Sequence, residues 1–238
     1  MACRQFSDYN SGSIKGSGCA VKIPAETPED DIFREARLYS INPLVGCIDT
    51  FVAANMVEKI ESQLRSVKLE DAKTGSLSGA VVSDRRTAKN FKIRHDSIPV
   101  IDEVTEKIAK VFRLKKSHCE YPEYISYDEG KEFKRHFDAA LSGSLPAWGN
   151  GEVAPSQRIF TGILYLNSDF DGGKTVFPRL GVELTPKLGR LAFWQNTKPG
   201  TNKVHGHSMH EGCPVTNGNK RIVSFWFRNL PWALEKAK

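Results

Sequence analysis

The sequence lacks several features that would place it in a class of protein at once. No apolar run approaches the roughly 18 residues that suggest a transmembrane helix, and the first 18 residues are polar, unlike the apolar centre of a secretion signal. The five cysteines are odd in number and no two lie within four residues of each other, so zinc-ribbon and C-x-x-C redox motifs are excluded. We therefore expect reduced thiols in a cytoplasmic protein.

The charge balance of the chain indicates no particular kind of partner. The chain carries 34 Lys and Arg against 28 Asp and Glu, and these residues are scattered without the signature of a DNA- or RNA-binding module, so no nucleic-acid partner is expected. With 238 residues, 39% hydrophobic and 26% charged, the composition is that of an ordinary folded protein. It excludes global disorder, a collagen-like fibre and a disulfide miniprotein.

The pattern along the chain predicts a loose arm followed by one domain. Residues 1–35 hold several Gly and Pro but few large apolar side chains, which indicates a flexible N-terminal arm; residues 36–238 form the domain. Within it, an apolar segment over 39–51 indicates a strand. Apolar residues at helical spacing predict one amphipathic helix over 56–64 and a second one after Pro99.

Short strand-like segments dominate the chain after Tyr121, and turn-forming Gly, Pro, Asn and Asp separate them. The predicted strands are 123–127, 133–139, 158–166, 174–177, 182–184, 190–195 and 221–228. The polar region 70–97 indicates a long loop with short strands. Helices followed by many short strands favour an α+β domain with a sandwich or jelly-roll core.

A histidine and an aspartate lie two residues apart in the predicted strand 133–139. Because side chains alternate between the two faces of a strand, His136 and Asp138 point to one side while Phe137 points to the other. An imidazole and a carboxylate then share one wall of the domain. Alone, such a triplet is more often an ordinary polar pair than a metal site.

Features further along the chain strengthen the signal. One more histidine would complete two imidazoles and one carboxylate, the facial triad of non-haem Fe(II) oxygenases, and by spacing alone His205, His207 or His210 would serve. The strand from Lys220 places Lys220, Ser224 and Trp226 on one face. Burying an ammonium is costly unless it is paired, and the distal carboxylate of a bound 2-oxoacid would supply that pair.

Four blocks of the sequence resemble the prolyl 4-hydroxylases of the Fe(II)/2-oxoglutarate-dependent dioxygenase superfamily. They occur in the family's order, and the resemblance covers roughly residues 40–230. The blocks are Tyr127-x2-Gly130-x5-His136-Phe137-Asp138, Arg158-x2-Thr161-x3-Tyr165-Leu166-Asn167, Gly172-Gly173-x-Thr175-x-Phe177-Pro178 and His210-x-Gly212-Cys213-Pro214-Val215-x2-Gly218-x-Lys220. The resemblance implies a double-stranded β-helix, or jelly-roll, core with N-terminal supporting helices.

The resemblance also implies a role for each matching residue. His136, Asp138 and His210 are expected to bind iron, with His210 preferred because the Gly-Cys-Pro-Val block and Lys220 are in register with it. Lys220 is expected to pair with the distal carboxylate of 2-oxoglutarate. The residues expected around the co-substrate are Tyr127, Thr161, Tyr165 and Ser224, and those expected near the substrate are Arg158, Trp226, Arg85 and Arg86. Phe133 stands where the family commonly has a tyrosine.

The activity implied by the resemblance is hydroxylation of a peptidyl proline. The family uses Fe(II), 2-oxoglutarate and O2, releases succinate and CO2, and takes ascorbate to keep iron reduced. The expected partner is a proline-containing peptide or protein, with no membrane. Substrate identity is expected to reside in the loops 70–97 and 140–157 rather than in the fold.

Three alternatives stay open from the sequence. The same cofactor chemistry could act on a free amino acid, a lysyl side chain or a small metabolite. A non-catalytic jelly-roll binding module is the second alternative, but such a module has no need for the three ligands together with Lys220. A zinc hydrolase is the third, because zinc accepts the same ligands, but it would leave Lys220 and Tyr165 without a role.

Overall fold

The computed structural model describes residues 35–76, 79–82, 85–141 and 157–232 of the chain. The predicted arm at 1–35 therefore lies almost wholly outside the described residues, as does most of the predicted substrate loop at 140–157. In the described residues, no helix is long and apolar enough to cross a membrane.

In the part of the chain that the structure describes, two α-helices and the short 3-10 helices η3 and η4 accompany the strands. Helix α1 spans Ala54–Leu64 and α2 spans Pro99–Val111, while η3 and η4 span Lys116–His118 and Gly206–Ser208. Both α-helices confirm the predictions. Helix α2 begins with Pro99, whose missing N–H has no partner to lose in the first turn, and α1 buries Val57, Ile60 and Leu64 on one face.

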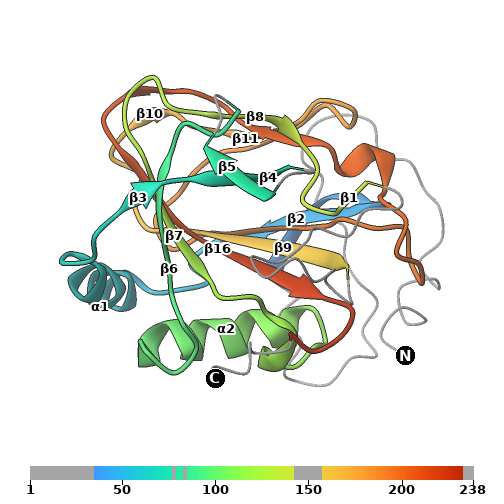
Figure 1. Ribbon diagram of the computed structural model, residues 1–238, viewed down its shortest axis with the longest axis horizontal. Coiled ribbons are helices and arrows are strands. Elements are labelled where there is room, and N and C mark those ends of the chain that lie inside the picture. Colours follow the sequence, from blue (N-terminus) through green and yellow to red (C-terminus); the bar gives the residue numbers. More distant parts are fainter. Residues whose placement is uncertain (1–34, 77–78, 83–84, 142–156, 233–238) are drawn as a thin grey trace.

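The strands of the described residues form one large sheet and three smaller ones (Figure 1). Their bounds are β1 Ala36–Ile41, β2 Leu44–Ile48, β3 Glu70–Asp71, β4 Lys73–Ser76, β5 Gly79–Val82, β6 Lys89–Lys92, β7 Glu123–Tyr127, β8 Phe133–His136, β9 Arg158–Tyr165, β10 Asp171–Gly172, β11 Thr175–Phe177, β12 Val182–Leu184, β13 Leu191–Gln195, β14 His210–Gly212, β15 Val215–Asn217 and β16 Lys220–Arg228.

Two of the sheets carry the architecture. The eight-stranded sheet has the order β1-β2-β13-β9-β16-β7-β6-β3, and the four-stranded sheet has the order β12-β11-β14-β8. Every described pair is antiparallel. In Figure 1 both helices lie against the lower side of the large sheet, while β8 and β11 lie above it. This arrangement is the jelly-roll core with supporting helices that the sequence predicted.

Alternation along β16 divides the interior into two layers. Val223, Phe225 and Phe227 face the helices, where the ring of Phe112 stacks on Phe160 with centroids 4.7 Å apart. Residues of the other parity point between the two sheets, where they meet a second apolar cluster that includes Trp194, Tyr165 and Phe177. The candidate site lies in this second layer.

Some predicted boundaries were wrong. The apolar segment over 39–51 is not one strand, because β1 and β2 form a hairpin that joins the large sheet beside β13. Predicted strand 133–139 ends at His136, so Asp138 lies just beyond β8. Strands β10, β14 and β15 were not predicted, since each has only two or three residues and no apolar alternation. The sequence predicted helices first and then strands, but four strands of the large sheet, β1, β2, β3 and β6, precede α2 in the chain.

Candidate active site

Two histidines and an aspartate meet where β8 pairs with β14. His136 is the last residue of β8 and lies directly opposite His210, the first residue of β14. Nε2 of His136 lies 3.5 Å from Oδ1 of Asp138, and Nε2 of His210 lies 3.6 Å from Oδ2. All three potential ligand atoms fall within 4.8 Å of one another, in the only such cluster among the described residues.

Each imidazole is oriented by its second nitrogen. Nδ1 of His136 donates to the carbonyl of Lys134 at 2.7 Å, and Nδ1 of His210 donates to the carbonyl of Ser208 at 2.9 Å. A neutral ring that donates from Nδ1 presents the lone pair of Nε2, which is the arrangement found in metal-binding histidines. The ring of Phe133 stacks on His136 with centroids 3.4 Å apart.

The protonation states suit a metal. Burial, reinforced by the charge of His136, lowers the pKa of His210 to about 4. Burial opposes ionisation of Asp138, but the two histidines and Arg158 outweigh it and hold the pKa of that carboxyl well below its usual range. At neutral pH the Nε2 lone pair of His210 therefore faces the carboxylate of Asp138 at 3.6 Å, an arrangement that a cation between them would stabilise. Two nitrogens and one oxygen fit Fe(II) with open coordination positions.

Lys220 lies in the same pocket as the three ligands. Its ammonium is buried between the rings of Tyr127 and Tyr165, at 5.3 and 5.6 Å from their centroids, and donates to the carbonyl of Gly173 at 2.6 Å. Burial lowers the pKa of Lys220 to about 8. The residues lining this pocket are Arg86, Ile125, Tyr127, Phe133, His136, Asp138, Thr161, Ile163, Thr175, Trp194, His210, Gly212, Lys220, Ile222, Ser224 and Trp226.

Known proteins are similar to this chain in sequence and in fold. Residues 122–228 match the model of the 2OG-Fe(II) oxygenase superfamily. The chain is similar to this superfamily over that range. It is a 2-oxoglutarate-dependent dioxygenase related to prolyl 4-hydroxylases. It is 29% identical over 182 residues to a putative prolyl 4-hydroxylase of Acanthamoeba polyphaga mimivirus, covering 75% of this chain and 73% of that one.

Further relatives differ in length or share mainly the fold. The oxygenase spans about a third of the Gallus gallus prolyl 4-hydroxylase subunit alpha-1, at 28% identity over 71% of this chain and 32% of that one. Its fold is similar to the viral collagen prolyl hydroxylase of Paramecium Bursaria Chlorella virus-1, with a TM-score of 0.62, 22% identity, and 78% and 96% of the two chains covered. A Trichoplax adhaerens prolyl hydroxylase, solved with a hypoxia inducible factor peptide fragment, gives a TM-score of 0.56 and 15% identity over 76% and 81%.

The predicted co-substrate residues of the oxygenase fall into two groups. Tyr127 and Ser224 line the pocket, and Tyr127 lies opposite Lys220 in the β7–β16 pair. The hydroxyl of Tyr165 forms a hydrogen bond of 3.0 Å with the hydroxyl of Thr175. Thr175 lines the pocket, whereas Tyr165 does not. Thr175 was missed as a functional residue, although the Gly-Gly-x-Thr block contains it. Thr161 lines the pocket too, but its hydroxyl donates to Asp138 rather than toward Lys220.

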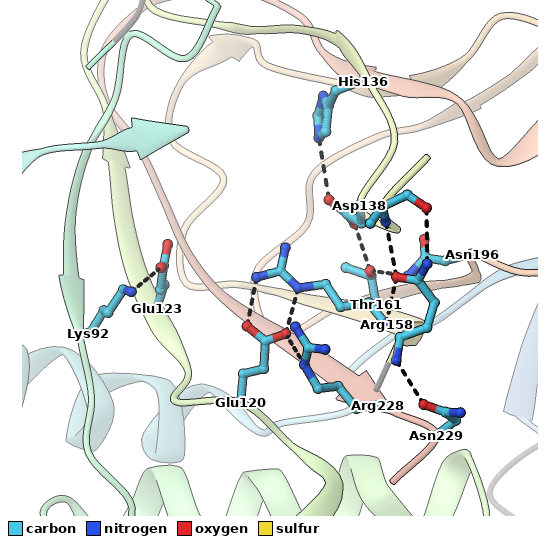
Figure 2. Close-up of polar contacts among 12 residues, drawn as sticks. Lys92, Glu120, Glu123, His136, Asp138, Arg158, Thr161, Asn196, Arg228 and Asn229 are labelled. Carbon is cyan, nitrogen blue, oxygen red and sulfur yellow. Dashed lines mark hydrogen bonds and ion pairs between the residues drawn. The ribbon is translucent and has the colours of Figure 1, made fainter. Parts of the chain in front are cut away.

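The predicted substrate residues Arg158 and Trp226 contact each other. Figure 2 shows Arg158 and Arg228 on the same carboxylate, that of Glu120. Arg158 contacts Glu120 through two hydrogen bonds of 2.6 Å, and its guanidinium lies 4.4 Å from the ring centroid of Trp226. Glu120 thus shares its carboxylate between the buried guanidinium of Arg228 and the half-buried guanidinium of Arg158. Sequence reasoning missed Glu120 and Arg228, because only the fold brings them to Arg158.

Arg85 and Arg86 occupy different environments, although both were predicted near the substrate. Arg85 is exposed and donates to the carbonyl of Arg135 at 2.9 Å. Arg86 is buried, pairs with Glu123 at 3.2 Å and lies 5.2 Å from the ring centroid of Phe133. Its guanidinium thus belongs to the wall of the pocket, whereas Arg85 does not line it.

Proposed function

We propose that this oxygenase hydroxylates a proline within a peptide or protein, in the manner of prolyl 4-hydroxylases, with release of succinate and CO2. The observation that carries the proposal is the pocket that holds His136, Asp138 and His210 together with the buried ammonium of Lys220. Metal ligands alone would suit several enzymes. A buried cation in the same pocket calls for a small anion that reaches the metal, and 2-oxoglutarate has that shape and charge.

The protein's own part in the chemistry is binding, orientation and exclusion of water. Fe(II) held by the three ligands supplies the oxygen-activating chemistry that couples decarboxylation of 2-oxoglutarate to hydroxylation of a C–H bond. Lys220 and the hydroxyl of Thr175 bind the distal carboxylate, with Tyr127 and Ser224 beside them. The aromatic and apolar walls of the pocket keep water from the co-substrate. Ascorbate would return iron to the ferrous state after unproductive turnovers.

The substrate side of the proposal rests on Arg158 and Trp226. Trp226 lines the pocket on the same strand as Lys220, and the guanidinium of Arg158 lies over its ring. A flat indole face suits a pyrrolidine ring, and a guanidinium suits peptide carbonyls. The relatives named as prolyl hydroxylases support a proline in this place. A proline-containing protein is accordingly the proposed partner, met in a cytoplasmic setting.

A mass-spectrometric screen tests the proposal. The full chain is incubated with Fe(II), 2-oxoglutarate, O2, ascorbate and a panel of proline-rich peptides, each matched by a peptide with alanine in place of proline. We expect a gain of about 16 Da on proline, with succinate formed in step and no product from the alanine peptides. Succinate formation and a 16 Da gain only on free amino acids, lysyl peptides or small metabolites would keep the cofactor chemistry and replace the substrate. Absence of 2-oxoglutarate turnover on every substrate would contradict the proposal.

A further inference from the structure

Asp138 is held by a chain of hydrogen bonds that the proposed function does not account for. The hydroxyl of Thr161 lies 2.6 Å from Oδ2 of Asp138, and Nδ2 of Asn196 lies 2.9 Å from the same hydroxyl (Figure 2). Asn196 is fully enclosed, Thr161 is 1% exposed and the side chain of Asp138 is 6% exposed. Side chains in such a position beside a metal ligand control how that ligand is presented.

The direction of each hydrogen bond follows from the chemistry of the groups. An amide NH2 only donates, so Asn196 donates a hydrogen bond to the hydroxyl oxygen of Thr161. The hydroxyl of Thr161 therefore uses its single hydrogen to donate a hydrogen bond to Asp138, because an ionised carboxylate only accepts. Asn196 therefore fixes the hydroxyl of Thr161 as a donor to Oδ2. Oδ1 takes no hydrogen bond from Thr161 and faces Nε2 of His136 at 3.5 Å, while Oδ2, which accepts from Thr161, lies 3.6 Å from Nε2 of His210.

The orientation of Asn196 has a cost that points to function. Its Oδ1 is buried and finds no hydrogen-bond partner within the described part of the chain. An unsatisfied buried acceptor costs about 1–3 kcal/mol, and native proteins keep such groups where they serve a purpose. The reverse orientation would place Oδ1 against the hydroxyl of Thr161 and draw its proton away from Asp138. The observed orientation gives up one hydrogen bond of Asn196 and keeps the one that reaches the ligand.

The backbone of Asn196 connects to the other side of the site. Its N–H donates to the carbonyl of Ile159 at 2.8 Å, which fixes it to the strand that carries Thr161. Its carbonyl accepts from the hydroxyl of Ser208 at 3.1 Å, and the carbonyl of Ser208 accepts from Nδ1 of His210. One residue thus reaches two of the three ligands, Asp138 through its side chain and His210 through its main chain.

We infer that Asn196 and Thr161 are positioning residues that make Asp138 a one-oxygen ligand. A carboxylate with both oxygens free can coordinate a metal through both oxygens, and the second bond takes one more coordination position. With Oδ2 occupied by Thr161, Asp138 and the two histidines leave three positions for a two-atom grip by 2-oxoglutarate and for O2. This inference rests on the proposed function, because it concerns the same metal ligands.

Co(II) titration of the full chain without O2 tests the inference, because the visible absorption of Co(II) reports both its affinity and its coordination. Thr161→Val keeps the shape of the side chain and removes the hydroxyl. We expect it to raise the Kd for Co(II) about 10- to 100-fold, and to change the Co(II) absorption spectrum. Asn196→Leu should do the same, and the double variant should lose no more than the larger single loss, because both act through one hydrogen bond.

Two matched variants separate this role from a general effect on folding. Thr161→Ser returns the hydroxyl and should restore both affinity and spectrum. Thr105→Val removes another fully buried threonine hydroxyl, which donates to the carbonyl of Ile101 within α2, and should change neither. Thermal unfolding without metal checks that each variant folds. If Asn196→Leu does not fold, the result for Thr161→Val alone tests the inference.

The possible results distinguish this inference from the proposed function. A wild-type protein that consumes 2-oxoglutarate with Fe(II), together with a Thr161→Val variant of unchanged Co(II) affinity and spectrum, overturns the inference alone. A wild-type protein that binds neither Fe(II) nor Co(II) overturns both. Weaker binding and an altered spectrum in Thr161→Val, restored by Thr161→Ser, support the positioning role.

Discussion

The ammonium of Lys220 donates to the carbonyl of Gly173 and meets no carboxylate within the described residues. Gly173 has φ +62°, and a Cβ there would lie 2.8 Å from the ring of Phe170 and 3.0 Å from Cδ of Lys220. Glycine at this turn is what lets the lysine stem pass. The site therefore keeps a buried charge ready for a ligand, at the expense of stability.

Replacing Lys220 should separate stability from co-substrate binding. A pKa lowered from 10.5 to about 8 corresponds to about 3 kcal/mol of disfavoured charge at neutral pH. We expect Lys220→Met to raise the thermal midpoint of the protein without ligands and to abolish the further rise that 2-oxoglutarate gives the wild type. Lys174→Met, which removes an exposed lysine paired with Glu183, should leave the 2-oxoglutarate effect intact. An equal loss in both variants would remove Lys220 from the site.

The same lysine predicts a pH dependence with a definite sign. Its folded pKa lies below its unfolded value, so between about pH 8 and 10.5 the unfolded chain binds the extra proton. Wild-type stability should therefore rise relative to Lys220→Met across this window, until the difference between them closes. Urea unfolding of both proteins from pH 7 to pH 10.5 measures it. A constant difference over the window would contradict the lowered pKa.

Much of the fold could be predicted because its signals are local. The faces of α1 and α2 and the alternation along β16 are written in neighbouring residues, and they decide which side chains meet the helices. Strands β10, β14 and β15 could not be predicted in this way. Each is too short for a period, and each exists because a distant strand pairs with it, as β8 pairs with β14.

The candidate site divides along the same line. His136, Asp138, His210 and Lys220 could be predicted from spacing and motif. Asn196 could not, because it meets Thr161 only after β13 pairs with β9. Glu120 lies just before β7 and meets its two arginines from β9 and β16 across the large sheet. Residues that support the ligands depend on these long-range pairings, which a single sequence does not display.

Phe133 should support iron binding through its contact with His136. The two rings lie nearly parallel, 13° apart, so the phenylalanine limits rotation of the imidazole. Aromatic pairs of this kind contribute about 0.5–1.5 kcal/mol, which corresponds to about a 2- to 12-fold change in affinity. We expect Phe133→Leu to weaken Mn(II) binding by this factor in an equilibrium titration, and Phe133→Tyr, which keeps the ring, to preserve it. Wild-type affinity in Phe133→Leu would show that the stack does not support the ligand.

Glu120 should be far more important for folding than its sequence context suggests. Its carboxylate is buried between Arg158 and Arg228, with N–O distances of 2.6 and 2.8 Å. Glu120→Gln would remove the charge that the buried guanidinium of Arg228 and the half-buried one of Arg158 share, and breaking a buried pair costs about 3–5 kcal/mol. Glu183→Gln breaks an exposed pair with Lys174 and should cost less than about 1 kcal/mol. Urea unfolding of both variants measures the contrast, and similar small losses would mean that the arginines are hydrated.

Arg158 provides the sharpest test of the substrate side. Arg158→Lys keeps the positive charge but loses the two-pronged grip on Glu120 and the flat group over Trp226. If Arg158 orients the peptide, the KM for a proline peptide should rise about tenfold or more, as expected for loss of a charged hydrogen bond, while the 2-oxoglutarate concentration for half-maximal succinate formation stays unchanged. Arg179→Lys, at an exposed arginine that donates to the carbonyl of Gly206, controls for the substitution itself. Should the 2-oxoglutarate requirement rise instead, Arg158 would act on the metal centre through Asp138, whose pKa it helps to lower. Measuring the peptide KM and the 2-oxoglutarate requirement in one variant thus decides whether Arg158 orients the peptide or acts through Asp138.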